Sequence, residues 1–166
     1  ELFKVPADEK PEYNGVQLIN SKVIVSYLKQ LLRNDLQYAP FEMVAMEKPV
    51  AEKITIQTGQ GPITLRLGGT IDRMDAKDTT LRIVDYKTGT PEPRKTAAPD
   101  ERQALGGDYW RQLAFYKILL ENARLYPEPV GKTAVSWLEP DKRGAFPITE
   151  IAFSSEDIQL VTALIR

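Results

Sequence analysis

Residues 83–89 read IVDYKTG, an apolar run that ends in an acidic and a basic residue two positions apart. The run closes a strand predicted over residues 80–87, after a polar turn. Because side chains alternate along a strand, Asp85 and Lys87 point to the same side. A carboxylate and an ammonium group placed together can hold a divalent cation and stabilise developing negative charge. The alternative is a surface ion pair, worth less than about 1 kcal/mol.

A second stretch, residues 68–75, reads GGTIDRMD and lies at the end of a strand predicted over residues 63–74. On that strand Asp72 falls on the face opposite Ile71. The paired glycines allow another backbone or a ligand to approach closely. The alternative is a solvent-facing Asp72 beside a hairpin.

A third stretch, residues 109–116, reads YWRQLAFY and opens a helix predicted over residues 109–124. Gln112 and Tyr116 are i, i+4 neighbours on one face of it. The rest of the helix is apolar nearly all round, so we expect it to be buried. A buried Gln112 needs hydrogen-bond partners, and packing alone is the alternative to a functional role.

The remaining elements follow from apolar periodicity and turn residues. An extended lead-in over residues 1–19 precedes a helix capped by Asn20 or Ser21, with its apolar stripe at Ile24, Tyr27, Leu28, Leu31 and Leu32. Further strands are predicted over residues 41–49, 52–58, 132–138 and 147–153, a loop over residues 88–107, and a last helix near Ser155, with Ser154 and Asp157 in a capping box. Strands with helices on either side predict an α/β fold, a mixed central sheet flanked by helices.

Length and the course of the chain indicate how it is organised. The 166 residues suffice for one domain with a hydrophobic core, and we expect a single domain over residues 1–166. The chain begins at Glu1 and its last helix lacks a terminal glycine or proline, so we expect a fragment of a larger chain, truncated at its N-terminus. No apolar run reaches the length of a membrane-spanning helix, so no membrane contact is expected.

The chain contains no cysteine and no histidine. These absences exclude thiolate nucleophiles, Ser-His-Asp triads, zinc-cysteine sites and Fe–S clusters within these residues. Carboxylates, Lys, Tyr and backbone carbonyls remain, and that donor set suits Mg²⁺ or Mn²⁺. A lack of cysteine also fits a reducing, cytoplasmic location.

In this order and spacing the three stretches resemble the nuclease domain of the PD-(D/E)XK superfamily, which has a restriction-endonuclease-like fold. The closest type is the RecB-like domain of UvrD/Rep-type helicase–nucleases. The matching motifs are residues 69–75, 85–89 and 112–116, and the resemblance spans roughly residues 41–140.

The resemblance implies a role for each matched residue. Asp72 and Asp85 would bind the metal through their carboxylates, helped by the backbone carbonyl of Tyr86. Lys87 would orient or deprotonate the attacking water and stabilise the pentavalent phosphorane. The residues that would line the cleft and position the phosphate or Lys87 are Gln112 and Tyr116.

One feature of this type is missing. RecB-like members typically carry an upstream histidine that completes the metal shell, and this chain has none. Either that residue lies N-terminal to Glu1, or the site is degenerate. Glu47 matches a glutamate often seen on the strand ahead of the first aspartate, and is expected to play a supporting role; a surface glutamate is the alternative.

DNA contact is expected to be local, because the net charge is only −1. Basic residues surround the proposed site and would contact phosphates independently of base sequence. Besides Lys87 these are Arg94, Lys95, Arg102 and Arg111. Alternatively, they solvate a mobile loop.

The resemblance therefore implies a Mg²⁺- or Mn²⁺-dependent deoxyribonuclease, exonuclease-like, within a helicase–nuclease that acts in DNA end processing and recombinational repair. Its partners would be DNA, the helicase portion of the same polypeptide and a second helicase–nuclease subunit. One alternative is an inactive nuclease-like scaffold that binds DNA or another subunit. Another is a protein-interaction domain without DNA binding.

Overall fold

The structure, a computed structural model, describes residues 14–165. The chain divides into two units, residues 1–39 and residues 40–166, and each is described by itself. None of the helices among the described residues is long and apolar enough to cross a membrane.

The first unit contains helix α1, Gly15–Tyr38. Asn14 caps it through a capping box: its side chain accepts from the Gln17 N–H at 2.9 Å, and the Gln17 side chain accepts from the Asn14 N–H at 3.0 Å. The predicted start at Asn20 or Ser21 is therefore wrong, and residues 15–19 are helical instead of extended. The prediction overlooked Asn14 and Gln17, whose three-residue spacing is the signature of such a box. The rest of the predicted lead-in lies outside the described residues.

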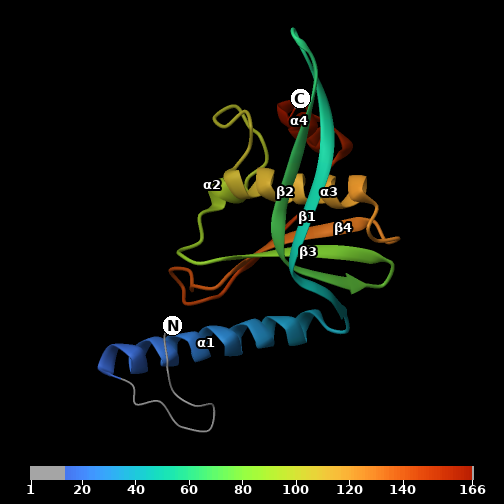
Figure 1. The fold of residues 1–166 in the computed structure, drawn as a ribbon. Coiled ribbons are helices and arrows are strands. Elements are labelled where there is room, and N and C mark those ends of the chain that lie inside the picture. Colours follow the sequence, from blue (N-terminus) through green and yellow to red (C-terminus); the bar gives the residue numbers. More distant parts are fainter. Residues whose placement is uncertain (1–13, 166) are drawn as a thin grey trace. The chain divides into compact units, whose positions relative to one another are not determined.

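The second unit is built on one mixed five-stranded sheet in the order β1-β2-β3-β4-β5 (Figure 1). Its strands are β1 (Glu42–Thr58), β2 (Gly61–Lys77), β3 (Thr80–Lys87), β4 (Val130–Trp137) and β5 (Ile148–Ile151). Only β3 and β4 are parallel; the other neighbouring pairs are antiparallel. The predicted mixed sheet flanked by helices is confirmed.

Three helices belong to this unit: α2 (Pro93–Thr96), α3 (Asp108–Ala123) and α4 (Ser155–Ile165). A parallel pair needs a crossover connection, and α3 supplies it between β3 and β4. Its buried residues, among them Trp110, Leu113 and Leu119, pack into the core with Ile71 and Ile83 of the sheet. The buried α3 was therefore predicted correctly.

The predicted capping box of α4 is also confirmed. The Asp157 carboxylate accepts from the Ser154 N–H at 2.9 Å, and the Ser154 hydroxyl accepts from the Asp157 N–H at 3.1 Å. The strands predicted over residues 63–74, 132–138 and 147–153 are present, with ends that differ by one to three residues.

Two predictions about the chain path need correction. The strands predicted over residues 41–49 and 52–58 form one continuous strand, β1. Pro49 does not interrupt it, because β1 is an edge strand that pairs only with β2, and an edge strand tolerates proline. The loop predicted over residues 88–107 contains the short helix α2 and a bridge between Asp100 and Gln103.

The hairpin of β1 and β2 extends well beyond the rest of the sheet (Figure 1). The two strands pair along their whole length, whereas β2 pairs with β3 only over residues 73–77. Its outer part is therefore a two-stranded ribbon. Leu67 packs against the core, while Ile63 and Leu65, farther out, are exposed.

A charged network is buried where β2 pairs with β3. Asp75 accepts two hydrogen bonds from the Arg82 guanidinium, both at 2.9 Å, and lies 3.0 Å from Arg73. Arg73 also donates to the Tyr86 hydroxyl at 3.0 Å and lies over the Phe41 ring. All three charged side chains are less than 5% exposed. Removing one partner from such a network leaves uncompensated buried charge.

Asp75→Ala should therefore lower the free energy of unfolding by about 3–5 kcal/mol, because Arg73 and Arg82 lose their shared carboxylate in a buried setting. Urea unfolding measures the loss. The matched control is Glu101→Ala, which removes an exposed carboxylate and should change stability by no more than about 0.5 kcal/mol. Equal stability of the two variants would contradict the structural role of the network.

Candidate active site

Asp72 and Asp85 lie on neighbouring strands at the point where these strands part. The last registered pair of β2 and β3 is Arg73 with Val84. Beyond it, the Asp72 carboxylate accepts a hydrogen bond from the Tyr86 backbone N–H at 2.8 Å. The side chain thus replaces a ladder hydrogen bond, and this contact fixes Asp72 beside the end of β3.

Asp85 is almost fully buried, with 2% of its surface exposed. Lys87 Nζ lies 2.7 Å from Asp85 Oδ2, although this oxygen accepts no hydrogen bond of good geometry. Burial raises the pKa of the Asp85 carboxyl, Lys87 opposes that shift, and the negative charge of Asp72 adds to it. Asp72 and Asp85 thus lie close enough for the charge of one carboxylate to act on the other.

Lys87 begins a chain of hydrogen bonds that runs along α3 through Gln112 to Tyr116, here called the relay. Its ammonium group donates to Gln112 Oε1 at 2.9 Å, and Gln112 Nε2 donates to the Tyr116 hydroxyl at 3.0 Å. The i, i+4 spacing of Gln112 and Tyr116 gives both access to the same end of β3. The predicted convergence of these residues with the acidic pair is thus present.

Gly69 makes room for the end of this relay. A Cβ atom at this position would lie 2.8 Å from Cε1 of Tyr116. Gly68 is needed for a different reason, since its Cβ would lie 2.7 Å from the Val50 carbonyl oxygen. The paired glycines therefore permit close approach, as expected, to an aromatic ring and to the neighbouring strand.

Tyr109 is a contact that the sequence motifs did not suggest. The Lys87 ammonium lies 4.7 Å from the centre of its ring, and Lys95 approaches the same ring at 5.4 Å. The Tyr109 ring also lies 5.7 Å from that of Trp137. The available signal was its position three residues before Gln112, which places both side chains on one helical face.

The donor set at this site fits a hard divalent cation. Asp72 and Asp85 offer carboxylate oxygens from adjacent strands, and Asp85 Oδ2 is buried without a well-formed hydrogen bond. Mg²⁺ is commonly held by one or two carboxylates and keeps several waters. The part of the chain that the structure describes contains no metal-binding group of three or more acidic side chains. Two side chains, a backbone carbonyl and waters would complete such a shell.

Glu47 does not join the acidic pair. The registered pairs on either side of it place Glu47 opposite Asp72. Its backbone, however, adopts a positive φ of 48°, and its side chain is exposed. A supporting role for Glu47 therefore stays a prediction.

Most of the predicted phosphate-contacting residues already have acidic partners. Arg94 pairs with Asp100, Lys95 with Glu92, and Arg111 with Asp108. The side chain of Arg102 has no ion pair among the residues that the structure describes.

The segment that carries these cations is anchored to α3. The Gly107 N–H donates to the Ala97 carbonyl at 2.8 Å. A Cβ atom on Gly107 would overlap the backbone carbonyl of Lys95. The segment therefore packs directly on the helix start.

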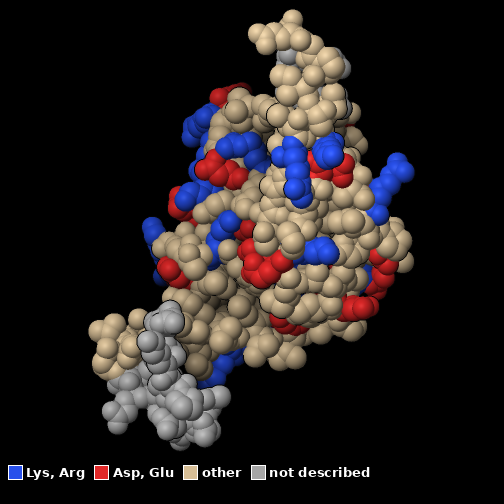
Figure 2. Space-filling model, in the orientation of Figure 1, with Lys and Arg blue, Asp and Glu red and all other residues tan. Residues whose placement is uncertain are grey.

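Charges of both signs are interspersed on the face of this unit seen in Figure 2, without a broad basic patch.

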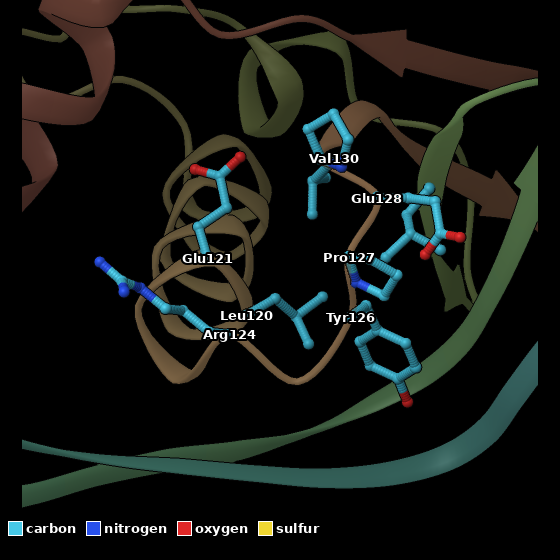
Figure 3. Close-up of a pocket in the computed structure, with 9 residues that line it drawn as sticks. Leu120, Glu121, Arg124, Tyr126, Pro127, Glu128 and Val130 are labelled. Carbon is cyan, nitrogen blue, oxygen red and sulfur yellow. The ribbon is translucent and has the colours of Figure 1, made fainter.

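A cavity of about 300 Å³ lies at the opposite end of the parallel strands, lined by Leu81 at the start of β3 and Val130 at the start of β4. Figure 3 shows its Leu120 side chain directed toward the connection to β4, while Arg124 points away. It is separate from the acidic pair, which lies at the carboxyl end of β3.

A family model of the PD-(D/E)XK nuclease superfamily matches residues 2–166, and the chain therefore belongs to this superfamily. Members of this superfamily are usually nucleases that depend on a divalent metal such as Mg²⁺ and act on DNA. Among curated proteins, the chain has no match.

Gly69→Ala should destabilise the chain by about 1–3 kcal/mol, because the added methyl group collides with the Tyr116 ring. The same substitution in a Tyr116→Ala background should cost much less, since the colliding ring is gone. Urea unfolding of the four proteins in this cycle measures the coupling. Gly59→Ala is the control, because nothing lies within 4 Å of a Cβ there; additive losses at Gly69 and Tyr116 would contradict the collision.

Asp85 should also leave a signature in the pH dependence of stability. Its pKa in the folded chain lies above the ordinary value of 3.8, so between these two values the folded state holds a proton that the unfolded state has released. The free energy of unfolding due to Asp85 therefore falls as pH rises through that window. Unfolding in EDTA should show this slope in the wild type and a smaller one in Asp85→Asn. Parallel pH profiles would contradict the raised pKa.

Proposed function

We propose that the chain is a RecB-like, Mg²⁺- or Mn²⁺-dependent deoxyribonuclease module, exonuclease-like, of a cytoplasmic helicase–nuclease in DNA end processing and recombinational repair. The observation that carries this proposal is the convergence of two carboxylates, an ammonium group and the relay on α3 at one end of the sheet. Membership of the PD-(D/E)XK superfamily supports the nuclease chemistry. The helicase portion and a second subunit are part of the same proposal.

In this proposal Asp72 and Asp85 hold the metal with the Tyr86 carbonyl. The contact between Asp72 and the Tyr86 N–H fixes both the carboxylate and the peptide unit that follows Asp85. A bound divalent cation would supply Lewis-acid stabilisation and a water of lowered pKa. The chain contributes a rigid acidic site, because Asp85 is buried and Asp72 is fixed between strands.

Lys87 is the residue proposed to act on the reacting groups. Its ammonium group is held between Asp85, Gln112 and the face of the Tyr109 ring. From there it can orient the attacking water and stabilise the negative charge that develops on the phosphorane. Gln112 and Tyr116 are positioning residues, because they act through Lys87.

One observation favours the second candidate, an inactive scaffold that binds DNA or a subunit. Only two acidic side chains gather at the site within the described residues, and Lys87 is in direct contact with one of them. A chain of this kind would bind DNA without cleaving it. Mn²⁺-dependent cleavage of linear duplex DNA separates the two candidates.

Lys87→Ala should lower turnover by about 100-fold or more while changing DNA affinity little, because the charge acts mainly on the transition state. Asp85→Ala supplies the background rate. Steady-state cleavage with Mn²⁺ gives kcat and KM, and fluorescence anisotropy gives the DNA Kd.

Lys132→Ala is the matched control, because it removes an exposed ammonium group of β4 that pairs with Glu150 instead of Asp85. It should leave kcat near the wild-type value. If Lys87→Ala weakens DNA binding and keeps turnover at saturation, Lys87 is only a phosphate contact. Wild-type binding without cleavage above the Asp85→Ala background would favour the scaffold.

A further inference from the structure

A cavity of about 560 Å³ opens between the segment after β3 and the turn that joins β4 to β5. Its size falls within the range of about 300–1,000 Å³ that is typical of ligand sites. One wall contains Pro91 and Pro93 of the segment after β3, and the other contains Pro147 and residues 141–143 of the turn. The cavity therefore combines apolar rings with a charged rim.

This cavity directly adjoins the candidate active site. Trp137, which lines it, is the strand partner of Lys87, and neighbouring strands lie about 4.8 Å apart. The Leu138 N–H donates to the Lys87 carbonyl at 2.9 Å. The Tyr109 ring lies between the two sites, in contact with the Lys87 ammonium and with the Trp137 ring. A ligand in the cavity would therefore be a near neighbour of a phosphate held at Lys87.

The rim of the cavity presents two cations on a fixed turn. The Asp141 carboxylate accepts from the backbone N–H groups of Ala145 at 3.0 Å and Arg143 at 2.8 Å, which lowers the pKa of Asp141. The Asp141 N–H donates in turn to the Ala145 carbonyl. Lys142 and Arg143 are both exposed on this turn.

Lys142 and Arg143 differ from the basic residues of the segment after β3 in their lack of ion pairs within the described part of the chain. Arg94 and Lys95 form ion pairs with acidic side chains, whereas Lys142 and Arg143 form none among residues 14–165. The acidic group on the opposite wall, Glu92, is itself paired with Lys95. Asp141 also lines the cavity, and its negative charge interacts with Arg143. With two cations and one carboxylate, the turn still carries a net positive charge on the side of the cavity that adjoins Trp137.

We infer that this cavity binds the nucleotide next to the scissile phosphate on the cleaved DNA strand, with Lys142 and Arg143 contacting its phosphates and the lining prolines packing against its sugar and base. The inference rests on the proposed function and adds a substrate subsite to it. Phosphate contacts position a strand without reading its sequence, so the subsite accepts any base.

The test compares the double variant K142A/R143A with wild type, using a fluorescein-labelled thymidine oligonucleotide in EDTA. Each phosphate contact to single-stranded DNA contributes about 0.7 to the slope of log affinity against log salt, so the slope should fall by about 1.4 and the affinity near 0.1 M salt by about 10- to 30-fold. The melting temperature should stay near that of the wild type, because both side chains are exposed.

The matched control is K53A/R66A. Lys53 and Arg66 are exposed cross-strand partners on the β1–β2 ribbon, so this variant loses the same two charge types elsewhere. It should bind DNA with nearly wild-type affinity and slope. If both double variants lose DNA affinity equally, the loss comes from the change in net charge alone, and the subsite is overturned.

A second measurement locates the contact on the strand. Uncharged methylphosphonate linkages are placed singly around the mapped cleavage position. A linkage next to that position should weaken wild-type binding but add nothing to the loss in K142A/R143A. Additive losses at every position overturn the subsite alone. A wild-type chain that neither binds nor cleaves DNA overturns the proposed function, and the subsite with it.

Discussion

The hydrogen bond from the Tyr86 N–H to the Asp72 carboxylate links the sheet to the candidate chemistry. Two antiparallel strands normally continue their ladder until one of them turns away. Here an acidic side chain takes the place of the next backbone acceptor, so β2 and β3 part while remaining joined. The acidic pair, Lys87 and the relay on α3 all depend on where this contact leaves the end of β3.

The local patterns in the sequence predicted this arrangement well. Alternation placed Asp85 and Lys87 on one side of a strand that the structure confirms as β3, Thr80–Lys87. The helical spacing of Gln112 and Tyr116 predicted a shared face, and the paired glycines at 68 and 69 predicted close approach. Each of these features is decided by residues only a few positions apart, where backbone geometry leaves few alternatives.

Features that depend on distant residues were beyond such patterns. Two strands were predicted where the structure has the single strand β1, and the tolerance of Pro49 inside it follows from the edge position of that strand in the sheet. The contact of Lys87 with Tyr109 joins a strand to a helix across a segment of irregular chain. The buried network of Arg73, Asp75 and Arg82 could not be predicted without the register of β2 against β3. In each case, contacts between residues far apart in the sequence determined the observed structure.

The parallel pairing of β3 with β4 also bears on the stage of folding at which the candidate site can form. Asp85 is registered with Val135, and the crossover helix between them carries Gln112. Contacts between residues so distant in sequence form slowly, because the entropy of closing the intervening loop must be met first. A chain still being synthesised, with β4 not yet added, has no completed sheet against which α3 can present Gln112 to Lys87. We therefore expect the site to form only once β4 has paired with β3.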